Sequence, residues 1–133
     1  MHPVNTYDTE FELELLGAIL QYFSEWTIEN PNQKKHQEGY ENFKRETGNG
    51  MRYFTEVVLP ACGGGVYLAF YGGDIPAGVA KEVRYFLENS LPLWEITPDF
   101  KVIVRREIPE RRILSVEETR ARIRDEDGNT LPY

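Results

Sequence analysis

Residues 51–91 read MRYFTEVVLPACGGGVYLAFYGGDIPAGVAKEVRYFLENSL, and this stretch decides the fold that we predict. Residues 52–59 are rich in aromatic and β-branched side chains, which favour a pleated strand, and Pro60 would end that strand because it cannot donate to a ladder. Residues 61–65 contain three consecutive glycines and can reverse the chain, so that residues 66–71 return as a second strand. The first half of the stretch therefore predicts a β-hairpin.

Two amphipathic patterns predict the helices that would cover this hairpin. Pro76 opens a helix at residues 76–89, in which apolar side chains recur at helical spacing. Residues 9–26 form the other helix, with Thr9 and Glu12 spaced as a capping box. Apolar residues lie almost all round this helix, whereas an ordinary surface helix is mainly polar. We therefore expect it to be buried on two sides, by the sheet and by either another helix or a second subunit.

Three further segments complete the expected core elements. Residues 33–47 predict a polar helix that stops at Gly48. Residues 93–97 lie between two prolines and predict a short edge strand. Residues 100–108 alternate apolar and charged side chains, so they predict a third strand that Pro109 ends.

The C-terminal segment has two alternative interpretations. The sequence Ser115-Val116-Glu117-Glu118 is typical of a capping box and predicts a helix over residues 115–126. Alternatively, Asp127-Gly128 is a common hairpin turn, which would pair residues 120–125 with residues 129–133. The helix is the preferred interpretation.

Together these patterns predict one α+β domain over residues 1–133. Its sheet would be antiparallel, with three to five strands that include residues 52–59, 66–71 and 100–108. The helices at 9–26 and 76–89 would pack mainly on one face of this sheet. A hairpin followed by a helix favours this arrangement over a parallel β-α-β pattern.

Composition restricts the function classes. The net charge of −7 argues against a protein that coats long nucleic acids, because such binding depends on neutralising phosphates. No apolar run reaches the roughly 18 residues that a membrane span needs, so we expect no membrane partner. The single cysteine, Cys62, fits a reducing compartment, and with the lack of a signal-peptide pattern it predicts a cytoplasmic location.

No complete catalytic, metal or cofactor motif is present, so we expect neither a metal nor a cofactor. A zinc-dependent deaminase would need a second cysteine after Cys62, and a nucleophilic thiol would need a nearby base. The glycines of residues 63–65 lack the lysine of a phosphate-binding loop. The same region could nevertheless line a ligand pocket, whose candidate residues are Cys62, Gly63, Gly64, Tyr67 and Tyr71.

Basic residues are concentrated near the C-terminus. Residues 1–100 carry fifteen acidic and seven basic side chains, whereas residues 101–133 carry seven and eight. Arginines pair readily with carboxylates and phosphates, so one candidate binding surface for an acidic partner consists of Arg105, Arg106, Arg111 and Arg112. The alternative is that these arginines pair with local glutamates.

These observations favour a small acidic regulatory protein that acts through protein–protein contact and is not an enzyme. The apolar first helix is the positive sign for such a contact, and a twofold homodimer is one form that it could take. The alternative function is that of a small enzyme or ligand-binding domain with a pocket near residues 62–71.

Overall fold

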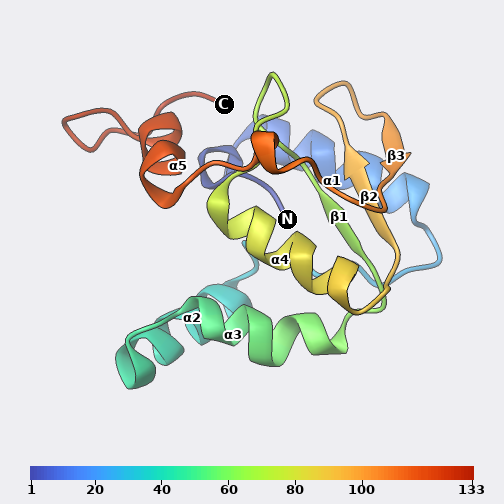
Figure 1. Ribbon diagram of the computed structural model, residues 1–133, viewed down its shortest axis with the longest axis horizontal. Helices are drawn as coiled ribbons and strands as arrows, with labels where there is room; N and C mark the ends of the chain where they lie inside the picture. The colour runs from blue at the N-terminus through green and yellow to red at the C-terminus, as the bar shows by residue number, and fades with distance from the viewer.

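The computed structural model describes residues 1–133 and contains a three-stranded mixed sheet with helices around it (Figure 1). β1 (Gly65–Tyr67) pairs in parallel with β2 (Leu93–Ile96), and β3 (Val102–Val104) pairs with β2 in the antiparallel direction. The predicted α+β class is confirmed, but the prediction of a purely antiparallel sheet is wrong. β2 is also the central strand and not an edge strand.

The parallel pairing follows from the connection between β1 and β2. α4 (Ala77–Glu88) leaves from one end of β1 and carries the chain back, so β2 runs in the same direction as β1. This is the β-α-β pattern that the sequence analysis disfavoured. The predicted hairpin partner of residues 66–71 does not exist, because residues 52–59 are helical.

A continuous helical segment occupies residues 51–61 in place of the predicted strand. It consists of α3 (Met51–Tyr53), a π-helical stretch at Phe54–Val58 and a 3-10 turn at Leu59–Ala61. Arg52 and Glu56 form an ion pair four residues apart, which is a helical spacing. β-branched and aromatic residues favour strands only where they fit a pleated, half-buried surface, and here tertiary packing decides otherwise.

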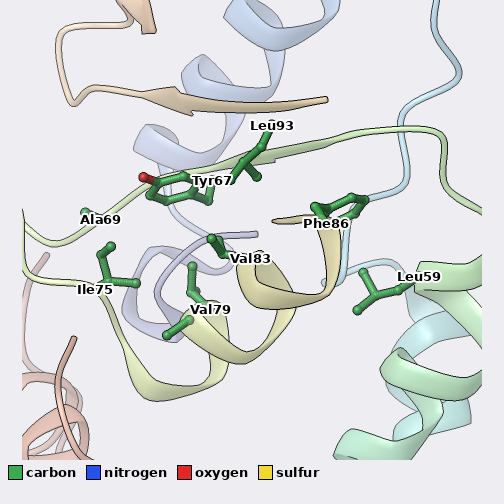
Figure 2. Close-up of a cluster of buried hydrophobic side chains, with 9 residues drawn as sticks. Leu59, Tyr67, Ala69, Ile75, Val79, Val83, Phe86 and Leu93 are labelled. Atoms are coloured by element: carbon green, nitrogen blue, oxygen red, sulfur yellow. The ribbon is translucent and has the colours of Figure 1, made fainter. Parts of the chain in front are cut away.

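α1 (Glu10–Tyr22) and α4 lie on opposite faces of the sheet. On the face toward α1, Leu15 packs with Leu68 and Ile96. On the other face, the side chains of α4 point toward Tyr67 and Leu93 (Figure 2). Successive residues of a strand point to opposite faces, so β1 and β2 contribute side chains to both cores. The predicted placement of the helices mainly on one face is not confirmed.

The outer face of α1 is not covered by any other element. Leu13 is 70% exposed, and Leu20, two turns later on the same side of the helix, is 54% exposed. The expectation that a second helix of the same chain covers this face is therefore wrong. The predicted N-terminus is confirmed, since the Thr9 hydroxyl accepts a hydrogen bond from the Glu12 backbone N–H.

α2 (Lys34–Thr47) forms as predicted and ends at Gly48, whose φ of 77° is the left-handed conformation that favours glycine. It packs on α3 through Gly39. A Cβ atom at Gly39 would lie 2.3 Å from the ring of Tyr53. The Tyr53 hydroxyl is in turn 2.8 Å from Nδ1 of His36, so this glycine allows the two helices to approach closely.

The C-terminal segment combines features of both interpretations. α5 (Val116–Ile123) begins with a complete capping box made by Ser115 and Glu118, which confirms the helix. After it, Arg124 and Thr130 form an isolated antiparallel bridge. None of the helices in the chain has the combination of length and apolar character that crossing a bilayer requires.

Candidate ligand-binding cavity

A cavity of about 460 Å³ lies between α1, the sheet and the helical segment 51–61. On the α4 side it is lined by Glu82 and Phe86. Gly65 allows Phe86 and Met1 to approach the start of β1, because a Cβ atom there would lie 2.6 Å from the ring of Phe86 and 3.0 Å from the side chain of Met1. Five parts of the sequence, residues 1–2, 15–31, 54–68, 82–86 and 94–96, thus contribute to one partly open cavity.

Aromatic side chains form the outer wall of the cavity. The ring centroids of Phe23 and Trp94 are 4.9 Å apart, and those of Trp26 and Trp94 are 6.1 Å apart. Trp26 is 44% exposed and lies over Gly63, where a Cβ atom would be 3.4 Å from the indole. Both tryptophans of the chain therefore line this cavity.

The π-helical stretch supplies part of the inner wall. The N–H of Leu59 bonds to the carbonyl of Phe54, five residues earlier, which defines the π-helical turn. In a regular α-helix, residues five apart point in directions that differ by roughly 140°. Here Phe54 and Leu59 are both buried and both line the cavity, with Val58 between them. The irregular turn therefore brings these side chains to one wall.

Glu82 is the unusual polar group of the cavity. Its residue is only 8% exposed, and no hydrogen bond or ion pair involves its carboxyl group. The carboxyl oxygens keep some accessible surface, since Oδ1 of Asn5 is the one fully buried polar side-chain atom without a partner. Burial raises the pKa of Glu82 to about 7, although the nearby amino group of Met1 opposes the rise. Buried carboxyl groups normally have partners, so this group requires an explanation.

The other polar groups beside the cavity already have partners. Nε2 of His2 is 2.7 Å from a carboxylate oxygen of Glu12, and burial lowers the pKa of His2 to about 4. The thiol of Cys62 donates to the carbonyl of Val58 at 3.3 Å, and burial raises its pKa. Cys62 is consequently not set up as a nucleophile, because a reactive thiol needs a lowered pKa.

His36, the second histidine, is bound at both ring nitrogens. Its Nε2 atom is 2.7 Å from Glu29, and its Nδ1 atom is 2.8 Å from the Tyr53 hydroxyl. Both imidazoles of the chain are thus held by glutamates. No group of three or more histidine, cysteine, aspartate or glutamate side chains is arranged to hold a metal ion.

The structure separates the five predicted pocket residues into two groups. Cys62, Gly63 and Gly64 line the cavity. Tyr67 does not, because it points to the α4 side and its hydroxyl donates to Glu95 at 3.1 Å. Tyr71 is also elsewhere: it is 57% exposed and packs against the ring of Tyr133.

Glu82 was not among the predicted site residues, although the sequence contains a signal for it. Val79, Val83 and Phe86 recur at the spacing of the buried face of α4, and Glu82 occupies the remaining position of that face. A charged residue at an apolar helix position is a useful indication of a functional site. The walls contributed by α1 and Trp94 carry no comparable sequence signal.

Two of the four predicted binding arginines have a structural role. Arg105 donates to Glu95 at 2.9 Å, and Arg112 binds the same carboxylate through two nitrogens at 3.1 and 2.8 Å. Burial alone would raise the pKa of Glu95, but the bonds from Arg112 and Arg105 outweigh it and lower the pKa. Arg106 and Arg111 are exposed and make no hydrogen bond or ion pair.

Comparison of the chain with known protein families, with curated proteins and with solved structures finds no match. Its function therefore has to be inferred from the cavity, its lining side chains and its exposed surfaces.

Proposed function

We propose that this protein binds a small, mostly apolar organic molecule in the cavity between α1, the sheet and the helical segment 51–61. The observation that supports this proposal is the cavity itself, whose volume of about 460 Å³ falls within the usual size of small-molecule sites. Its walls are mainly apolar and aromatic, and a single buried carboxyl group without a partner faces it. Such sites commonly combine apolar walls with a few polar groups that orient the ligand.

The proposed activity is binding and not catalysis. Cys62, the thiol beside the cavity, has a raised pKa, and both histidines are held by glutamates. A general base needs a free ring nitrogen within reach of the proton that it removes. Both ring nitrogens of His36 are occupied, by Glu29 and by the Tyr53 hydroxyl, and Nε2 of His2 is occupied by Glu12. The ligand would therefore leave chemically unchanged.

The experiment compares two adjacent valines of the π-helical stretch. Val58 lines the cavity, whereas Val57 is 48% exposed and does not. With 2-phenylethanol as the probe, we expect a saturable change in tryptophan fluorescence, because both tryptophans line the cavity. Val58→Phe should fill the space and abolish this change, and Val57→Phe should preserve it. A wild-type protein without a saturable change, or equal behaviour of the two variants, would contradict the proposal.

Protein–protein contact is the second candidate function, and a specific observation supports it. Leu13 and Leu20 expose apolar surface on the outer face of α1, and a Cβ atom built on Gly17 would meet nothing within 4 Å outside the backbone of its own helix. A face of this kind, apolar and open to close approach, suits association with a second copy of the chain. Arg106 remains available for an acidic partner elsewhere on the surface.

A further inference from the structure

Glu82 differs from the other buried glutamates of the chain. Glu12 accepts hydrogen bonds from Asn32 and lies 2.7 Å from the His2 ring, and Glu95 is bound by two arginines and a tyrosine. Glu82 has no such partner, although its residue is only 8% exposed. An ionised carboxylate has about four acceptor positions, so all of this capacity is unused.

Packing does not explain why a glutamate occupies this position. Glu82 lies on the buried face of α4, between Val79 and Phe86, where a leucine or methionine would fit the helix pattern. Burying an unpaired carboxylate is costly, and apolar side chains of similar size are usually more stable in such positions. Burial also raises the pKa of Glu82 to about 7, and the nearby amino group of Met1 offsets only part of this rise.

The groups that face Glu82 do not neutralise it. The amino group of Met1 is close enough to lower the pKa of Glu82, but it donates its hydrogen bond to the Val66 carbonyl at 2.9 Å. The ring of His2 is engaged by Glu12, and the thiol of Cys62 donates to the Val58 carbonyl. Tyr7 is the remaining titratable neighbour, and burial followed by the Glu82 charge raises its pKa. None of these groups donates to the Glu82 carboxylate.

We propose that the ligand of this cavity is an amine on an aromatic body, and that its nitrogen donates a hydrogen bond to Glu82. This inference rests on the proposed function. A charged N–H donor is the strongest complement to a carboxylate in a region of low dielectric constant. The rings of Phe23, Trp26 and Trp94 suit an aromatic body, and aromatic faces also attract ammonium groups.

The test uses three probes that share one skeleton: 2-phenylethylamine, 2-phenylethanol and ethylbenzene. Affinities are measured at pH 8 by tryptophan fluorescence and by calorimetry. We expect the amine to bind about tenfold more tightly than the alcohol, because a charge-assisted hydrogen bond is stronger than a neutral one. At pH 5.5 the preference should diminish, since Glu82 becomes protonated while the probe remains a cation.

Two variants of α4 assign the preference to one side chain. Glu82→Gln keeps the shape of the residue but removes its charge. It should lower the affinity for 2-phenylethylamine to the affinity for 2-phenylethanol. Glu88→Gln removes a charge from an exposed position of the same helix and should leave the preference unchanged. If Glu82→Gln does not fold, the pH dependence of the wild-type preference decides the question.

The outcomes distinguish the two proposals. Equal affinity of the three probes, with loss of binding in Val58→Phe, would overturn the amine proposal and retain the cavity as the binding site. A preference for the alcohol, or an amine preference that Glu82→Gln does not change, would also overturn the amine proposal. Absence of saturable binding for all three probes would overturn the proposed function itself.

Discussion

Glu82 and Glu95 are both buried, but their surroundings move their pKa values in opposite directions. Burial raises the pKa of Glu82 to about 7, whereas at Glu95 the bonds from Arg112 and Arg105 exceed the effect of burial and lower the pKa. The difference comes from the hydrogen-bonding partners of the two carboxylates, because both residues are buried to a similar degree. Glu95 therefore stabilises the fold in its ionised form, whereas ionised Glu82 destabilises it.

Glu82→Gln should stabilise the protein in a manner that depends on pH. The pKa is about 7 in the folded chain and 4.5 for the unperturbed group, so the folded state binds more protons between these values. The stability of the wild-type protein is thus highest below pH 4.5 with respect to this group, decreases as the pH rises to 7, and is constant above it. Glutamine does not ionise, so the variant does not lose stability in this way as the pH rises.

Urea unfolding at pH 4.5 and pH 8 measures the effect. The difference in unfolding free energy between Glu82→Gln and wild type should be about 3 kcal/mol more favourable to the variant at pH 8. Effects of His2 cancel in this difference because both proteins contain it. Glu88→Gln serves as the control and should show little change. A difference that is the same at both pH values would contradict the assignment of the raised pKa.

The arginines show what residue-level reasoning could predict. The cluster at residues 105–112 was recognisable from the sequence, and so was the alternative that its members pair with glutamates. The actual partner, Glu95, lies on the neighbouring strand, and its distance in sequence from Arg112 hides the pairing. Arg105 and Arg112 meet at one carboxylate only because β2, β3 and the following turn are adjacent in space.

At the level of elements, two glycines in helices should respond to alanine in opposite ways. Alanine normally stabilises an exposed helix position by about 1 kcal/mol relative to glycine, and we expect this for Gly17→Ala because its Cβ would meet nothing within 4 Å. Gly39→Ala should instead destabilise by about 1–3 kcal/mol, since its Cβ would lie 2.3 Å from the Tyr53 ring.

Both changes are measured by denaturant unfolding, with helix content as the signal. In Gly39→Ala the Tyr53 ring must move, which also breaks the contact between its hydroxyl and His36. Hydrogen exchange should therefore increase in α2 and α3 of this variant and not in α1. Stabilisation by Gly39→Ala would show that the interface between α2 and α3 adjusts easily.

Elements with local signals were predictable, and those determined by tertiary contacts were not. The starts of α1, α4 and α5 follow from a cap or a proline, and the stop of α2 follows from Gly48. The segment 51–61 lacks such a signal, and its β-branched residues suggested a strand. Its helical form depends on burying Phe54 and Leu59 against the rest of the molecule.

At the scale of the whole molecule, the α+β class could be predicted, but the cavity could not. Its walls come from α1, the loop that contains Trp26, the segment 51–61, the sheet and α4. Their meeting depends on the parallel pairing of β1 with β2, which the sequence analysis did not anticipate. Of the candidate pocket residues, Cys62, Gly63 and Gly64 line the cavity, whereas Tyr67 and Tyr71 lie outside it.

Self-association is the prediction that belongs to this scale. If the outer face of α1 binds a second copy, sedimentation velocity should show a mass that increases with concentration in the micromolar range. Replacing Leu13 and Leu20 by serine should keep the chain monomeric, since these side chains provide the exposed apolar surface. Val116→Ser, which changes an exposed residue of α5, is the control. A wild-type protein that remains monomeric would contradict the dimer.

The two edges of the sheet differ in their exposure to further pairing. Met1 occupies the edge of β1, where its carbonyl accepts from the N–H of Leu68. The edge of β3 is open, but β3 is only three residues long and has Lys101 and Arg105 at its ends. A short edge strand offers few ladder bonds to a second chain. We therefore expect little edge-to-edge growth of the sheet, despite the exposed apolar side chain of Val104.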